Sequence, residues 1–302
     1  MKLGIVATGG GALNDTIAEV DALGFDAFYV VDHPSFDQPD AWTYLAWVAG
    51  QTQHMRLGTH VTGMPFRPPF QLAKQIVTVD SLSNGRAVLG IGTGYEYADF
   101  EPYGFEMLDF LGRIEQLEEG IQIMKSFWTQ ETTEFSGKHY QLEGGATFSP
   151  KPVQKPHPPI IIGLNRRGAL LRLAARQADA INTWQLGPAQ VAELAEHARA
   201  ACNDIGRDPA SLAITSDLIL ARGQTQEAAD QIAGGIAQMA RGWGRSELVT
   251  QWNHGGVLFG DGDNMLEQIA AFAELGVEEV DISSSDFDDI AWFSENVVAK
   301  SP

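Results

Sequence analysis

Residues 55–95, MRLGTHVTGMPFRPPFQLAKQIVTVDSLSNGRAVLGIGTGY, contain two short apolar runs on either side of a helical pattern. The runs at 55–61 and 87–92 are almost continuously apolar, as is typical of strands that are covered on both faces. A strand, a helix and a second strand in this order form the unit from which parallel α/β sheets are built.

The same alternation extends in both directions along the chain. Further apolar runs of strand length occur at 2–7, 25–31, 159–163, 179–184, 212–221 and 277–283. Amphipathic helical patterns lie between them, for example over 191–205. Eight such repeats without a flexible linker predict one α/β domain over residues 1–302, a TIM (β/α)8 barrel. A doubly wound parallel sheet is the structural alternative.

The fourth and fifth strands are separated by about 93–158, which is more than one crossover helix needs. This insertion contains a helical pattern over 111–128, a potential hairpin over 133–142 and a proline-rich segment over 149–160. A long insertion at one end of a barrel predicts a lid or a binding wall.

Composition excludes several partners. The net charge is −19 and the isoelectric point is about 4.6, which argues against binding to nucleic acid or to anionic membranes. Cys202 is the single cysteine, so no internal disulfide is expected. The sequence shows neither a signal peptide nor an apolar run of about 18 residues, the length of a membrane span. We therefore expect a cytoplasmic protein.

Polar residues follow the second and third strands, where barrel enzymes carry their chemistry. Asp32 and His33 end the second, and this pair suits proton transfer. The alternative is a helix-capping aspartate beside a hydrogen-bonded loop histidine. Thr59, His60 and Thr62 interrupt the third strand, which indicates a bulge that faces a ligand. A simple turn before a proline is the alternative.

The fourth strand ends in a glycine-rich loop. Gly90, Gly92 and Gly94 have the spacing G-x-G-x-G, which differs from the dinucleotide fingerprint. A backbone of this kind allows a planar ring to approach closely.

The fifth strand ends at Gly163 and is followed by Asn165, Arg166, Arg167 and a helix. Helix N–H groups and two guanidinium groups predict an anion site, and solvated arginines are the alternative. A proton carrier, a flat glycine shelf and a separate anion site together suit a flavin-like cofactor. We expect no metal site.

The sequence resembles the bacterial luciferase-like flavin and deazaflavin oxidoreductases in the residues and in the order of five motifs. These motifs are VVDHPS, residues 55–95 quoted above, RIEQLEEGIQIMKSFWT, FSGKHYQLEGGATFSPKPVQKPHPPIIIG and LLRLAARQADAIN. The clear matches extend from about residue 25 to residue 185, and they are closest to the branch that depends on coenzyme F420. The resemblance implies a TIM barrel that binds F420 or, alternatively, FMN.

The resemblance also implies roles for individual residues. His33 is expected near the reactive ring carbon, with Asp32 orienting it, and a non-proline cis peptide is expected at His60–Val61. Thr62 would approach the ring. The predicted cofactor-binding residues are Thr59, His60, Val61, Thr62, Gly92, Gly94, Tyr95, Gly163, Leu164, Asn165, Arg166 and Arg167.

The chain departs from the family's sugar-phosphate dehydrogenases. These carry a glutamate where this chain has Tyr95. The double glycine that is usual in the family after the fifth strand is Gly163–Leu164 here. We therefore expect hydride transfer between F420 and a small organic substrate, in a pocket walled by Phe66, Tyr95 and Trp184. The alternatives are an FMN-dependent luciferase-like monooxygenase and a non-catalytic flavin-binding barrel. A homodimer and a flavin or F420 reductase partner are implied by the resemblance alone.

Overall fold

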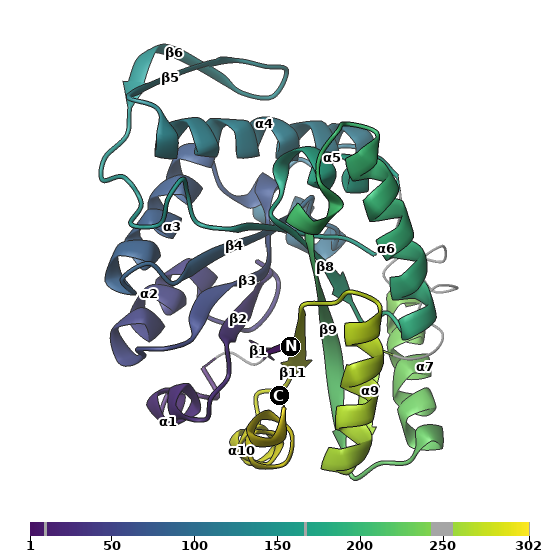
Figure 1. Cartoon of the computed structure of the whole chain (residues 1–302). Coiled ribbons are helices and arrows are strands. Elements are labelled where there is room, and N and C mark those ends of the chain that lie inside the picture. Colours follow the sequence, from purple (N-terminus) through teal and green to yellow (C-terminus); the bar gives the residue numbers. More distant parts are fainter. Residues whose placement is uncertain (9–10, 166–167, 243–255, 302) are drawn as a thin grey trace.

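The computed structural model describes residues 1–8, 11–165, 168–242 and 256–301, and its core is a closed barrel of parallel strands (Figure 1). Around the barrel the hydrogen-bonded order is β9-β11-β1-β2-β3-β4-β7-β8, and β8 pairs again with β9. This closure confirms the predicted TIM barrel and excludes the doubly wound sheet. The eight strands are β1 (Lys2–Ala7), β2 (Ala27–Asp32), β3 (Arg56–Gly63), β4 (Ala87–Gly92), β7 (Ile160–Gly163), β8 (Ala180–Trp184), β9 (Ala213–Arg222) and β11 (Glu279–Ser283).

A ninth strand, β10 (Val257–Gly260), was not expected from the sequence. It pairs in parallel with the last four residues of β9, from Ile219 to Arg222. The pairing of β9 with β11 ends at Ile219, so β10 covers the part of β9 that extends beyond the barrel. Its four residues are too few to show a periodic pattern.

Helices surround the barrel and bury their apolar faces against it (Figure 1). Aspartates begin several of them, because their side chains accept hydrogen bonds from free N–H groups of the first turn. Asp40, Asp109 and Asp261 do so for α2, α4 and α9. The helices are α1 (Ile17–Ala22), α2 (Ala41–Gln51), α3 (Pro69–Leu82), α4 (Phe110–Thr129), α5 (Ala169–Gln177), α6 (Pro188–Asn203), α7 (Gln226–Gly242), α9 (Gly262–Glu274) and α10 (Phe287–Asn296). None of the helices in the described ranges is long and apolar enough to cross a bilayer.

The insertion contains the predicted helix, as α4, and the predicted hairpin, formed by β5 (Thr132–Ser136) and β6 (Gln141–Thr147). Figure 1 shows the hairpin beyond α4, on the side away from the barrel. The Glu119 carboxylate of α4 accepts hydrogen bonds from the N–H groups of Lys138, His139 and Tyr140, which fixes the hairpin turn. The hairpin is therefore docked on the outer surface of a helix.

Candidate active site at the carboxyl ends of the strands

The barrel has a cavity of about 480 Å³ at the carboxyl ends of its strands. This size is typical of sites for small ligands and cofactors, and this end of a barrel is where active sites form. The insertion contributes only its first part to the lining, through Thr93, Gly94, Tyr95, Asp99 and Phe110. The expectation that the insertion walls the pocket therefore holds for this part. The described lining includes no residue of the β5–β6 hairpin.

Most of the residues predicted from the sequence line this one cavity. The three predicted wall residues, Phe66, Tyr95 and Trp184, also line it. Arg166 and Arg167 lie outside the described residues. The predicted site residues in the lining are Asp32, His33, His60, Val61, Gly92, Gly94, Tyr95, Gly163, Leu164 and Asn165.

Thr59 and Thr62 do not line the cavity. Both are fully buried. The Thr59 hydroxyl donates to the carbonyl of Gly90, and the Thr62 hydroxyl donates to Asp32. Trp42 in turn donates its indole N–H to Thr62. The two hydroxyls therefore hydrogen-bond to the neighbouring strands β4 and β2, and the expected approach of Thr62 to a ring has no counterpart in the cavity lining.

The floor of the cavity is the bulged end of β3. The His60–Val61 peptide is cis, as the family resemblance implied. The pairing of β3 with β4 shifts register between Gly58 and Thr62, which confirms the predicted bulge. A Cβ atom on Gly92 would lie 2.9 Å from Cγ2 of Val61, and one on Gly163 would lie 3.1 Å from the same side chain. These two glycines therefore leave the room that the Val61 side chain occupies at the floor of the cavity.

Asn165 connects the loop after β7 to the end of β8. Its amide oxygen accepts from the Trp184 N–H at 2.7 Å, and its amide nitrogen donates to the Trp184 carbonyl at 2.8 Å. The side chain thus fixes the loop in which the anion site was predicted.

His33 is paired with a carboxylate from the insertion. Its Nδ1 lies 2.6 Å from Oδ2 of Asp99, a residue that sequence reasoning missed as a partner. The N–H and the hydroxyl of Ser35 both donate to Oδ1 of Asp99. The predicted orienting role of Asp32 is wrong, because both of its oxygens accept from the Arg67 guanidinium instead. Asp32 is the last residue of β2, and its carboxylate also accepts from the Thr62 hydroxyl of the neighbouring strand β3.

This pairing determines which ring nitrogen of His33 is available for proton transfer. With Nδ1–H donated to Asp99, the imidazole presents Nε2 for proton transfer. Phe36 stacks on the ring at 4.3 Å, and Tyr95 meets it edge-on at 5.2 Å. Burial opposes ionisation of Asp99, yet the hydrogen bonds from His33 and Ser35 leave its pKa lower than usual. His33 is therefore held in one orientation beside a carboxylate that stays ionised.

The lowered pKa of Asp99 gives a pH-dependent stability. A carboxyl group whose pKa is lower in the folded state stabilises the protein above its unfolded pKa of about 4, and this contribution is lost as the pH falls through the folded value. We expect Asp99→Asn to lower the free energy of unfolding by about 1 kcal/mol at pH 7, on the scale of a hydrogen bond to a charged group. The loss should shrink steadily below about pH 4.

Urea unfolding of both proteins between pH 7 and pH 2 measures this difference. Asp263→Asn is a matched control, because Asp263 is a surface residue whose side chain is 83% exposed. A constant difference between wild type and Asp99→Asn over the whole range would contradict the assignment.

The lining is acidic and aromatic. Asp32, Asp99 and Asp217 line the cavity, and its described lining contains neither lysine nor arginine. Arg67 neutralises Asp32 from outside the lining. The aromatic members are Phe36, Phe66, Tyr95, Phe110 and Trp184.

Solved structures share this fold over the whole chain. An F420-dependent secondary alcohol dehydrogenase, solved with an F420-acetone adduct, matches with a TM-score of 0.84 and 18% identity, covering 100% of this chain and 99% of the other. Monooxygenase RslO1 from Streptomyces bottropensis matches with a TM-score of 0.79 and 22% identity, covering 99% of both chains. At these identities the similarity establishes the fold.

Sequence relatives extend this picture. An F420-dependent glucose-6-phosphate dehydrogenase from Kineococcus radiotolerans is 29% identical over 177 residues. The match covers 56% of this chain and 51% of the relative, about half the length of each. The family model described as luciferase-like monooxygenase matches residues 7–279. The family model thus covers most of the TIM barrel. The protein belongs to the luciferase-like monooxygenase family, as its motifs indicated.

Proposed function

We propose that the protein transfers a hydride between coenzyme F420 and a small, neutral organic substrate. The observation that carries this proposal is the oriented His33–Asp99 pair in the lining of the cavity. Two of the similar proteins, the secondary alcohol dehydrogenase and the glucose-6-phosphate dehydrogenase, are named as F420-dependent, which supports the choice of cofactor.

The residues present fit a planar ring. Val61 would support one face of the ring, and Gly92, Gly94 and Gly163, which line the same cavity, present no side chain of their own to it. The loop around Asn165 would hold the phosphate, with Arg166 and Arg167 as the predicted charged partners. When bound, the deazaflavin supplies the carbon that accepts or gives the hydride.

His33 would manage the proton that accompanies the hydride. When an alcohol is oxidised, its carbon loses a hydride and its hydroxyl loses a proton, and the proton passes to Nε2 of His33. Asp99 then stabilises the imidazolium through the hydrogen bond at Nδ1. In the reverse direction, His33 returns the proton to the carbonyl oxygen as the hydride arrives.

The lining favours a neutral substrate over a phosphorylated one. A phosphate dianion needs cations or N–H groups to replace its hydration, and the described lining supplies three carboxylates and five aromatic rings instead. The substrate class we propose is therefore a small alcohol, ketone or enone with an apolar body, in contrast to the phosphorylated sugar in the name of the curated relative.

Anaerobic assays with oxidised and reduced F420 test this choice. We expect turnover with secondary alcohols, ketones or enones, and a kcat/KM for glucose 6-phosphate at least about 100-fold lower, because an unpaired buried charge costs several kcal/mol. A preference for glucose 6-phosphate would contradict the proposed substrate class.

An FMN-dependent monooxygenase is the second candidate. The monooxygenases among the similar structures favour it, and so does the acidic composition, because the polyglutamyl tail of F420 needs a basic path out of the site. A non-catalytic flavin-binding barrel would bind a cofactor without turning over any substrate. The homodimer and the reductase partner remain parts of this proposal, and sedimentation of the purified protein tests the first.

A further inference from the structure

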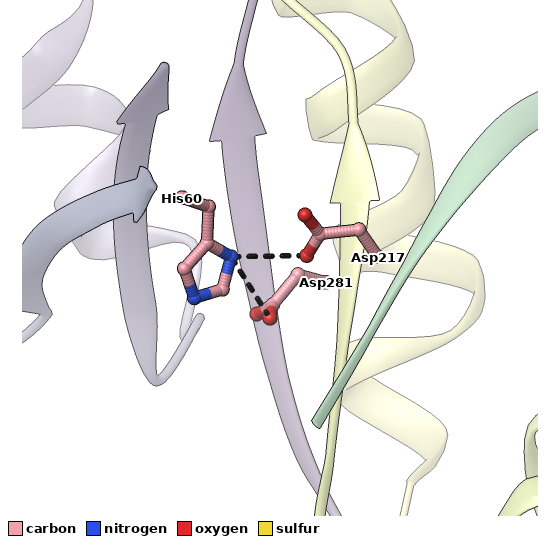
Figure 2. Close-up of side chains that lie close together, drawn as sticks. All are labelled: His60, Asp217 and Asp281. Carbon is pink, nitrogen blue, oxygen red and sulfur yellow. Dashed lines mark hydrogen bonds and ion pairs between the residues drawn. The ribbon is translucent and has the colours of Figure 1, made fainter. Parts of the chain in front are cut away.

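A layer of buried polar side chains lies inside the barrel, directly beneath the floor of the cavity. Figure 2 shows His60 of β3 pointing toward Asp217 of β9 and Asp281 of β11. Nδ1 of His60 lies 3.0 Å from Oδ1 of Asp217 and 3.8 Å from Oδ2 of Asp281. The side chains of His60 and Asp281 are fully buried, and that of Asp217 is 4% exposed. The first contact is a hydrogen bond and the second is longer than one.

The His60 ring is held on two sides. Its face stacks on Tyr29, with ring centres 3.6 Å apart and planes inclined by 11°. Its edge donates to Asp217, whose Oδ1 also accepts from the amide of Asn182 at 3.3 Å. A Cβ atom on Gly90 would collide with the Thr59 carbonyl and would lie 3.2 Å from Cδ2 of His60, so this glycine allows β3 and the ring to pack closely against β4. The imidazole therefore has one position, and the position depends on Asp217.

The His60 ring belongs to the residue that directly precedes Val61 at the floor of the cavity. His60 and Val61 are adjacent, and the Val61 side chain forms the floor against Gly92 and Gly163. A His60 ring that turned or shifted would move the peptide that carries Val61. His60 and Asp217 also line the cavity, whereas Asp281 does not, so the hydrogen bond between the first two lies at the boundary of the cavity and the barrel interior.

We propose that Asp217 is a positioning residue that holds the cavity floor, through its hydrogen bond to His60, in the shape that the cofactor ring needs. This inference rests on the proposed function, because it assumes that the cavity takes a planar cofactor.

Asp281 has a different part in the layer. Within the described residues both of its oxygens lack a hydrogen-bond partner. Burial raises its pKa well above the usual value, and the nearby Glu279 and Asp217 raise it further. Burial therefore favours the neutral form of Asp281, and Asp217 is the carboxylate that accepts the hydrogen bond from His60.

A divalent metal ion is the competing interpretation of three such side chains. The surroundings of both ring nitrogens of His60 argue against a metal ion. A histidine that ligates a metal almost always donates its other ring N–H to a partner, and Nε2 of His60 has none among the described residues. The direct hydrogen bond from Nδ1 to Asp217 already satisfies the nitrogen that would face the ion.

Two substitutions of Asp217 distinguish a positioning role of this residue from its other possible roles. Asp217→Ala removes the acceptor, and Asp217→Asn retains an oxygen that can accept from Nδ1–H. We expect Asp217→Ala to raise the Kd for F420 by about 10-fold, the effect of losing roughly one hydrogen bond, and to move the absorption band of the bound cofactor toward that of the free cofactor. Asp217→Asn should restore both to near wild type, with a Kd within about threefold.

The controls use the same layer. Asp281→Asn should leave the Kd unchanged, since Asp281 neither lines the cavity nor hydrogen-bonds to His60. Circular dichroism shows that each variant is folded, and a purely structural role would lower the melting temperature without moving the Kd or the spectrum. If Asp217→Ala does not fold, His60→Leu breaks the same hydrogen bond from the other side and is expected to raise the Kd equally.

Several outcomes would overturn the inference. One is a folded Asp217→Ala or His60→Leu variant that binds F420 as tightly as wild type. Another is an Asp217→Asn variant that loses as much affinity as Asp217→Ala. A third is about one equivalent of zinc or manganese in the purified protein that Asp281→Asn loses, which would make the layer a metal site. If wild type binds neither F420 nor FMN, the proposed function fails as well, whereas equal binding by wild type and Asp217→Ala removes this inference alone.

Discussion

Replacing His33 by alanine is expected to lower kcat at least about 100-fold while leaving the Kd for F420 within about threefold of wild type. The reason is that His33 is the group in the cavity held to give or take a proton, with Nδ1 fixed by Asp99 at 2.6 Å and Nε2 left for the substrate. The cofactor floor, by contrast, is formed by β3, β4 and β7, which the substitution does not touch. Anaerobic steady-state kinetics and a binding titration on the same preparation measure both quantities.

A histidine far from the cavity supplies the control. His54 precedes β3 at the opposite end of the barrel, and its side chain is 75% exposed. His54→Ala should therefore leave turnover unchanged. Unchanged turnover in His33→Ala would remove His33 from the mechanism, and a loss of cofactor affinity as large as the loss of kcat would make it a binding residue.

The Arg67→Met variant is expected to be less stable than wild type by about 3 kcal/mol. Arg67 donates to both oxygens of Asp32, at 2.5 and 3.0 Å, and their side chains are 11% and 6% exposed. Methionine keeps the apolar length of the side chain but leaves a buried carboxylate without a cation, which costs several kcal/mol. Among the residues that the structure describes, Thr62 would then be the remaining side-chain donor to Asp32. Urea unfolding at pH 7 measures the loss.

An exposed ion pair provides the comparison. Arg176 and Glu118 form one with side chains 41% and 28% exposed, so Arg176→Met should cost less than about 1 kcal/mol. Adding Asp32→Asn to Arg67→Met removes the unpaired charge and should recover at least half of the lost stability. Equal losses for Arg67→Met and Arg176→Met would show that Asp32 does not depend on Arg67.

The barrel strands were predictable because each is covered on both faces and is therefore apolar over most of its length. Residues 87–92, AVLGIG, form β4 with the predicted bounds, and all six residues are buried. Residues 257–260 were missed, because four residues at the edge of a longer strand leave no pattern. The bulge in β3 was visible in its interrupting polar residues, but the cis peptide followed from family resemblance alone.

The partners of the two important histidines were not predictable from local sequence. Asp99 is 66 residues from His33, and Asp217 is 157 residues from His60. The His60–Asp217 pair forms only when the barrel closes and brings β3 and β9 together. The His33–Asp99 pair forms only when the loop after β4 folds back toward the end of β2. Asp32 was chosen because it is adjacent to His33, yet its carboxylate pairs with Arg67, which lies 35 residues further along the chain.

Equilibrium binding of F420 and FMN to the wild-type protein, measured side by side in one buffer, tests the central claim most directly. The proposed site predicts saturable binding of F420 at sub-millimolar concentration, with a Kd at least about 10-fold lower than that of FMN. Tighter binding of FMN would contradict the choice of F420 and favour an FMN-dependent enzyme. Binding of neither cofactor below about 1 mM would contradict a redox role for the cavity.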